Sequence, residues 1–235
     1  MNPDFGIEIE FEADVNDWKK IFLSLRESIP NLVSDLFAST PDTECPIDYE
    51  YCWTLTADSS SYTCLELISP ILGSTPNLQV LKTLETANLI KFTKNCGIHI
   101  HVNISTFDLY QIKNVFKAWE FAEKFFRSIT AKERSNNIYC LSPIIKFDID
   151  EARNLNQLAY IYGDSRDFSL NAKSLISTQT LEFRLFESTS DQEKISNWIN
   201  QTLAFVKKAT DKNADFSNIV PSMLSVDDVK NLLEL

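Results

Sequence analysis

Apolar and polar residues alternate in four short stretches of the chain, and this alternation predicts β-strands. Successive side chains of a strand point to opposite faces, so each stretch has one apolar face and one polar face. If the strands share a sheet, their apolar faces are buried together and their polar residues converge on the opposite face. The four stretches are residues 5–12, 64–70, 96–103 and 180–186.

The polar faces of these strands carry the candidate chemistry. His99 and His101 are the only histidines in the chain, and their spacing of two places both on one face. Closely packed carboxylates repel one another unless cations neutralise them, so the pattern predicts a metal site. Glu12 lies at the end of its strand, and we assign it to the solvated surface. The other polar-face residues are Glu8, Glu10, Glu66, Glu182 and Arg184.

Apolar residues spaced three and four apart predict helices between the strands. A further short strand over residues 53–58 turns toward the Glu66 strand, and this hairpin brings Asp58 toward Glu66. We make no prediction for residues 31–51. The predicted helices run from Asn16 or Asp17 to before Pro30, from Pro76 to about Lys91, from Asp108 to about Ile129, around Glu151 to Tyr160, from Asp191 to about Lys208 and from Val226 to Leu233.

The mixture of strands and helices predicts an α+β fold. The chain of 235 residues is long enough to bury a substantial core. We predict one main domain over residues 1–212, and we expect residues 213–235 to form a loop and a short helix of the same domain.

Charge and composition narrow the functional classes. The net charge of −11 argues against broad affinity for nucleic acid or anionic lipid. No apolar run approaches the ~20 residues that span a bilayer, and we see no signal peptide, so we expect a cytoplasmic protein. The five cysteines form no CxxC pair, and we expect them to be reduced and not to build a structural zinc site. A glycine-rich phosphate loop is missing, so a nucleotide must be held by side chains and metal.

The motif strands, taken in order, resemble the amidoligase family. This family belongs to the carboxylate-amine ligase superfamily, which includes glutamine synthetase and γ-glutamylcysteine synthetase. Any one motif is weak evidence, but the ordered set from residue 5 to about residue 190 is specific. The matching pieces are Gly6 to Glu10, Asp58, Glu66 to Pro70, Gly97 to Val102, the tract at Arg134, Arg166 to Asn171, and Glu182 to Leu185.

The resemblance implies a fold and a set of site residues. The fold is a curved, mainly antiparallel sheet whose polar concave face holds ATP with Mg²⁺ or Mn²⁺, with helices packed on the convex face. Arg166, Arg184, Glu182 and His101 are implied to be catalytic. Arg134, Arg166, Arg184 and Asn171 are implied to bind the nucleotide. The implied metal ligands are Glu8, Glu10, Asp58, Glu66, His99 and Glu182.

The activity implied by the resemblance is ATP-dependent joining of a carboxylate to an amine, on small-molecule or peptide substrates. A substrate carboxylate and the triphosphate of ATP are both anionic and repel each other. Metal cations and guanidinium groups offset these charges and allow the two to react. Two alternatives stay open. One is a metallohydrolase, because a His-x-His pair with carboxylates also builds zinc sites. The other is a catalytically inactive relative that binds nucleotide. The residues do not decide the identity of the substrates or the oligomeric state.

Overall fold

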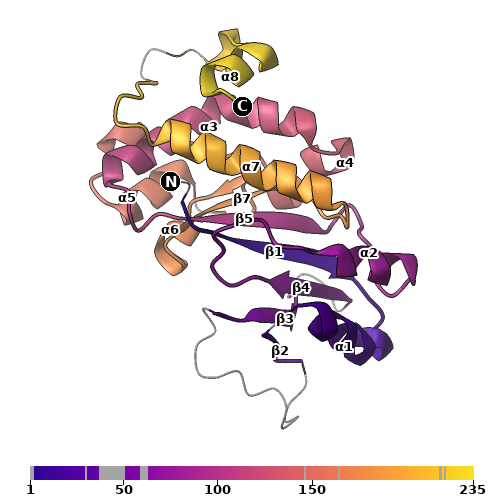
Figure 1. The fold of residues 1–235 in the computed structure, drawn as a ribbon. Helices are drawn as coiled ribbons and strands as arrows, with labels where there is room; N and C mark the ends of the chain where they lie inside the picture. Colours follow the sequence, from indigo (N-terminus) through magenta and orange to yellow (C-terminus); the bar gives the residue numbers. More distant parts are fainter. Residues whose placement is uncertain are drawn as a thin grey trace. The chain divides into compact units, whose positions relative to one another are not determined.

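The structure is a computed structural model of the chain. It describes residues 3–29, 31–36, 51–58, 63–145, 147–163, 165–216, 219 and 221–235. The chain divides into two compact units, coloured along the sequence in Figure 1. We call Asp4–His99 with Glu187–Asn197 the N-terminal unit, and we call Met1–Pro3, Ile100–Phe186 and Trp198–Leu235 the C-terminal unit.

The described strands and helices form an α+β fold, as the sequence predicts. Seven strands have the order β2-β3-β4-β1-β5-β7-β6 in an open, mostly antiparallel sheet. Strand β5 (Gly97–Asn103) is common to both units, because His99 ends a segment of the N-terminal unit and Ile100 begins a segment of the C-terminal unit. The predicted curvature of the sheet stays a prediction.

In the N-terminal unit, strand β1 (Phe5–Glu12) pairs with β4 (Cys64–Ile68), and β4 pairs with β3 (Trp53–Ala57). Both pairs are antiparallel. Strand β2 (Leu32–Ser34) lies in the segment without a sequence prediction, and it pairs with β3 in parallel. The apolar residues of β1 alternate with its glutamates, so they share the opposite face of the strand, and this face is buried. The buried set includes Ile7, Ile9, Phe11, Leu55, Leu65, Leu67 and Ile98.

Two helices of the N-terminal unit contact each other (Figure 1). Helix α1 (Trp18–Ser28) follows a short 3-10 turn (Val15–Asp17) and matches its prediction. Helix α2 (Gln79–Thr86) is shorter than predicted. The side chain of Gln192 accepts a hydrogen bond from the backbone N–H of Leu78 and donates one to the carbonyl of Pro76. Asn88 has a φ of 55°, which ends the helical path before Lys91.

The C-terminal unit is mainly helical. Its longest helix, α3 (Leu109–Ile129), begins at the predicted Asp108, which forms a capping box with Gln111. Helix α7 (Gln192–Ala209) begins in the N-terminal unit and continues into this one. Strand β6 (Leu170–Asn171) pairs with β7 (Thr180–Glu187). The shorter helices are α4 (Lys132–Ser135), α5 (Leu155–Tyr162), α6 (Ser174–Ser177) and α8 (Val226–Leu233).

An aromatic core joins α3, β7 and α7 within the C-terminal unit. The ring of Trp119 lies 5.0 Å from Phe126, 5.2 Å from Phe183 and 5.5 Å from Phe205, measured between centroids. All four side chains are buried. The indole N–H of Trp119 donates to Ser169 Oγ at 3.1 Å, so the polar edge of the ring is satisfied as well. The aromatic stripe of this helix therefore belongs to the core, which supports β7.

Two other sequence expectations concern cysteines and membranes. Cys64, Cys96 and Cys140 are buried thiols outside any disulfide. Cys52 departs from the expectation, because its sulfur is in a disulfide bond. Within the described part of the chain, no helix is both long and apolar enough to cross a membrane. The predicted domain boundary at residue 212 stays a prediction, and α8 packs against α3 within the C-terminal unit.

The aromatic core generates a stability prediction. Truncation of Phe126 to alanine removes a fully buried ring from α3, and we expect it to lower the free energy of unfolding by about 3–5 kcal/mol. Tyr110→Ala, at a half-exposed position of the same helix, is the matched control and should change it by about 0.5 kcal/mol or less. Denaturant titration measures both. Equal losses in the two variants would contradict this account of the core.

Candidate functional site

The first cluster of candidate residues lies in the N-terminal unit, on the polar faces of β1 and β4. The antiparallel register places Glu10 directly opposite Glu66. Directly opposed residues of paired strands have Cβ atoms about 4.5–5.5 Å apart, so two carboxyl groups meet here. Glu8 lies two residues before Glu10 on the same face of β1. The strand pairing thus crowds three carboxyl groups together.

His99 lies between two of these acids. Its Nδ1 is 2.9 Å from Glu8 Oε2, and its Nε2 is 3.4 Å from Glu10 Oε1. The imidazole is only 2% exposed. The other carboxylate oxygen of Glu10 accepts a hydrogen bond of 2.6 Å from the backbone N–H of Gly97. Strand β5 therefore orients Glu10 through the backbone N–H of Gly97. Its His99 ring contacts both Glu8 and Glu10.

The crowding has a large electrostatic effect on Glu66. Burial raises its pKa, and the neighbouring Glu8, Glu10 and Asp58 raise it further, to about 10. The cause is physical, because a low-dielectric environment and nearby negative charges both disfavour the ionised form. A divalent cation among these groups reverses the effect, since it favours the carboxylate over the acid. The electrostatic potential of this cluster therefore favours a cation over an anion.

The donor atoms of this cluster are close enough to share a metal ion. One ligand atom each from Glu8, Glu66 and His99 lies within 4.8 Å of the other two. Two carboxylates and one imidazole form an oxygen-rich set, which suits Mg²⁺ or Mn²⁺. The set fits the metal that the sequence predicts. Glu10 is next to this donor set because its carboxylate contacts the ring of His99. The charge of Asp58 raises the pKa of Glu66.

A second cluster lies in the C-terminal unit, on β6 and β7. Asn171 and Glu182 are directly opposite each other in the strand pair. The amide of Asn171 donates a hydrogen bond of 2.6 Å to Glu182 Oε2, and the guanidinium of Arg184 lies 2.5 Å from Glu182 Oε1. All three side chains are buried. Glu182 is thus held by a neutral amide on one oxygen and by a cation on the other.

His101 lies in the same unit at the neighbouring strand. Its Nδ1 is 3.0 Å from the hydroxyl of Thr180, which is two residues before Glu182 on the same face of β7. The sequence analysis did not single out Thr180, although the alternation of Thr180, Glu182 and Arg184 is visible in the sequence. The hydroxyl of Thr178 lies 2.8 Å from that of Thr180 and extends this polar row.

The two remaining arginines have different surroundings. Arg134 is 1% exposed, and its guanidinium donates a hydrogen bond of 2.9 Å to the backbone carbonyl of Arg184. This contact supports the backbone of β7 beside the second cluster. Arg166 is exposed, and no described residue pairs with its guanidinium. Arg166 is therefore the one predicted site residue that the described contacts do not join to a cluster.

Sequence reasoning also missed a buried polar chain behind β6. The Ser169 hydroxyl accepts from Trp119 and donates to Glu123 Oε1 at 2.5 Å, and the backbone carbonyl of Ser169 accepts from the N–H of Arg184. No sequence signal connects α3 with residue 169, because the contact depends on the tertiary fold.

The fold of this chain has a relative among the solved structures. Among solved structures, a bifunctional glutathione synthetase from Pasteurella multocida is similar, with a TM-score of 0.51 and 14% sequence identity. The match covers 99% of this chain and 40% of that one, so the chain spans less than half the length of the solved relative. At this identity the likeness shows the fold alone. No curated protein sequence matches this chain.

The family comparison covers most of the sequence. The family described as "Putative amidoligase enzyme" matches residues 2–206, which include both clusters of candidate site residues. Strands β1, β4, β5 and β7 all lie within the matched region. The ordered motifs of acids and histidines and the match along the chain lead to the same conclusion: this chain belongs to the amidoligase family.

Proposed function

We propose that this protein is an ATP-dependent ligase that joins a carboxylate to an amine. The observation that carries the proposal is the crowding of Glu8, Glu66 and His99, whose donor atoms lie within 4.8 Å of one another in a chain of the amidoligase family. Such a cluster offers donor atoms to a divalent cation, and a ligase of this kind uses divalent cations to bring two anions together.

We propose that Mg²⁺ or Mn²⁺ is held by residues of the first cluster. Glu8, Glu66 and His99 supply the closest donor set, and Glu10 and Asp58 add negative charge around it. Glu182 is a further proposed ligand from the second cluster. A divalent cation bound by these residues neutralises charge on the triphosphate oxygens. Because the backbone N–H of Gly97 and the ring of His99 restrain Glu10, the acids are oriented before a nucleotide arrives.

We propose that the second cluster serves the transferred phosphoryl group. Arg184 has its guanidinium oriented by Glu182, and Asn171 orients Glu182 in turn. A guanidinium held in this way matches the equatorial oxygens of a phosphoryl group as its charge spreads. His101, restrained by Thr180, is proposed to contact the substrate or the phosphate. Arg166 is exposed and remains a proposed phosphate ligand, whereas the contact of Arg134 supports a positioning role.

Strand β5 carries both histidines. His99 and His101 are two residues apart in one strand, so their side chains share a face of that strand. We propose that the polar faces of the motif strands form the concave, nucleotide-binding face that the family resemblance implies.

The proposed reaction has two steps. An oxygen of the substrate carboxylate attacks the γ-phosphorus, the bond from that phosphorus to the β-γ bridging oxygen breaks, and ADP leaves. The amine then attacks the carbonyl carbon of the acyl phosphate, inorganic phosphate departs, and the amine loses a proton to form the amide. Because the solved relative is a glutathione synthetase, amino acids and short peptides are the first acids and amines to test.

The ligase proposal predicts an acid- and amine-dependent release of ADP. With Mg²⁺ or Mn²⁺, the native chain should release ADP from ATP only when a pool of carboxylic acids and a pool of amines are both present. The mass of its product should equal that of the acid plus the amine, less one water. Glu182→Gln removes the negative charge that holds Arg184, and we expect it to lower the rate by about 100-fold or more. Coupled ADP detection and mass spectrometry measure these outcomes.

Glu187→Gln is the matched control, because it makes the same change at the other end of β7, at a position that faces Lys194. This variant should keep nearly full activity. Hydrolysis that requires zinc but not ATP would contradict the ligase proposal and favour the metallohydrolase alternative. ATP binding without turnover over a broad panel of acids and amines would favour the inactive relative.

The raised pKa of Glu66 predicts how stability depends on pH without metal. The folded chain keeps the Glu66 proton up to about pH 10, whereas an unfolded glutamate loses it near 4.5. The folded state therefore binds more protons in this window, and its stability falls as the pH rises through it. Glu66→Gln should flatten this fall, measured by denaturant titration in a chelator at several pH values.

The same variant also reports on the metal. Free Mg²⁺ or Mn²⁺ at about 100 times the dissociation constant should stabilise the native chain by about 2.7 kcal/mol. Glu66→Gln should lose most of this gain, and Glu187→Gln should retain it. A metal-dependent gain that is equal in both variants would place the cation away from the first cluster.

A further inference from the structure

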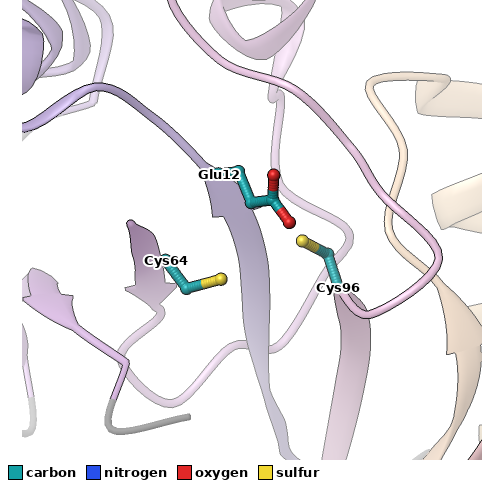
Figure 2. Close-up of side chains that lie close together, drawn as sticks. All are labelled: Glu12, Cys64 and Cys96. Atoms are coloured by element: carbon teal, nitrogen blue, oxygen red, sulfur yellow. The ribbon is translucent and has the colours of Figure 1, made fainter. Parts of the chain in front are cut away.

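A separate group of side chains lies at the end of the motif strands in the N-terminal unit. It consists of Glu12, Cys64 and Cys96, which Figure 2 shows close together. One ligand atom from each lies within 4.8 Å of the other two. The sequence analysis assigned Glu12 to the solvated surface and expected the cysteines to be reduced and to build no zinc site. The tertiary structure instead brings one carboxylate and two thiols to one point.

The strand pairing explains how these residues meet. Glu12 is the last residue of β1, and the register places it directly opposite Cys64, the first residue of β4. On the other side of β1, the backbone of Glu12 exchanges two hydrogen bonds with Lys91, at 2.9 and 2.8 Å. Cys96 immediately precedes β5. Three segments that are distant in sequence therefore each contribute one side chain.

A polar contact holds two members of the group in place. The hydroxyl of Thr93 donates a hydrogen bond of 2.8 Å to Glu12 Oε1 and lies 3.4 Å from Cys96 Sγ. Both cysteines are buried, while Glu12 is partly exposed. The carboxylate is therefore restrained, and it remains open to solvent on one side. A hydroxyl that bonds a ligand carboxylate is a typical outer partner of a metal site.

The geometry fits a shared ion better than a disulfide. Figure 2 shows Cys64 and Cys96 on opposite sides of the strand that carries Glu12. Neighbouring strands are about 4.8 Å apart, so two cysteines that flank one strand are separated by roughly twice that distance at the backbone. A disulfide needs Cα atoms within about 7 Å of each other. A metal ion bridges the gap, because its ligands lie roughly 3.5 Å apart around a tetrahedral centre.

We propose that Glu12, Cys64 and Cys96 bind a thiophilic divalent cation of the Zn²⁺ class, at a site distinct from the Glu8, Glu66 and His99 cluster. Two soft thiolates select zinc over the magnesium class, and zinc also accepts a carboxylate oxygen. Three protein ligands leave a fourth position for water. The ion links β1, β4 and the segment before β5, and the backbone N–H that follows Cys96 in turn holds Glu10.

Binding at this site releases protons. Burial raises the pKa of the Cys96 thiol, and the charges of Glu10 and Glu12 add to this effect, although hydrogen bonds from Thr93 act in the opposite direction. A metal ion displaces each thiol proton to the solvent and bonds to the thiolate that remains. No oxidant or reductant takes part in the step.

Cobalt titration of the reduced chain, under anaerobic conditions and without added thiol, tests the proposal. Thiolate ligands give Co²⁺ a sulfur-to-metal charge-transfer band that carboxylate and imidazole ligands do not give. We expect one equivalent of Co²⁺ to produce this band and Zn²⁺ to abolish it. Cys64→Ser and Cys96→Ser should lose the band, and Glu12→Gln should keep part of it with an affinity lower by about tenfold or more.

Cys140→Ser is the matched control, because Cys140 is also a buried thiol outside a disulfide but belongs to the C-terminal unit. This variant should bind Co²⁺ as the native chain does. A native chain without the band, or a band that survives in both Cys64→Ser and Cys96→Ser, would overturn the proposal.

If the cysteine variants do not fold, alkylation of the native chain gives an independent answer. Zn²⁺ should slow maleimide labelling of Cys64 and Cys96 by about tenfold or more, with no effect on Cys140, as read from peptide masses. Equal labelling of all three thiols with and without Zn²⁺ would count against the site.

Discussion

The repulsion among carboxyl groups on the polar faces of β1 and β4 is the constraint on which the candidate site depends. The register sets Glu10 against Glu66, and partial burial removes the water that would screen them. The pKa of Glu66 rises to about 10 as a result. A cluster that is costly without a cation gives a large gain when a cation binds. The proposed metal site rests on this consequence of the strand pairing.

The second cluster has the opposite electrostatic character, because its acid is already compensated. Glu182 receives a hydrogen bond from Asn171 and faces the guanidinium of Arg184. Behind it, the aromatic core of α3 and α7 fills the apolar side of β7, and the buried guanidinium of Arg134 bonds to the backbone of that strand. Rigid support of this kind suits side chains that must be oriented before a phosphoryl group arrives.

The end of β1 shows that one strand face can carry different ligand chemistries. Glu8 and Glu10 meet other oxygen ligands and an imidazole, whereas Glu12 meets two sulfurs. In the two proposed sites, the neighbours of each acid would decide between a hard and a soft cation, since all three acids are glutamates. Gly97 links the two regions, because its N–H holds Glu10 while its neighbour Cys96 contributes a thiol.

The sequence by itself determined the motif strands, most helices, the α+β class and the family resemblance, because these depend on local periodicity and on the order of motifs. It also singled out Glu8, Glu66 and His99, whose donor atoms the structure brings within 4.8 Å of one another. Only the tertiary structure decided the register of β1 against β4, the burial of Arg134 and the meeting of Glu12 with two cysteines. Contacts between segments distant in the chain set these features, and local alternation contains no record of them.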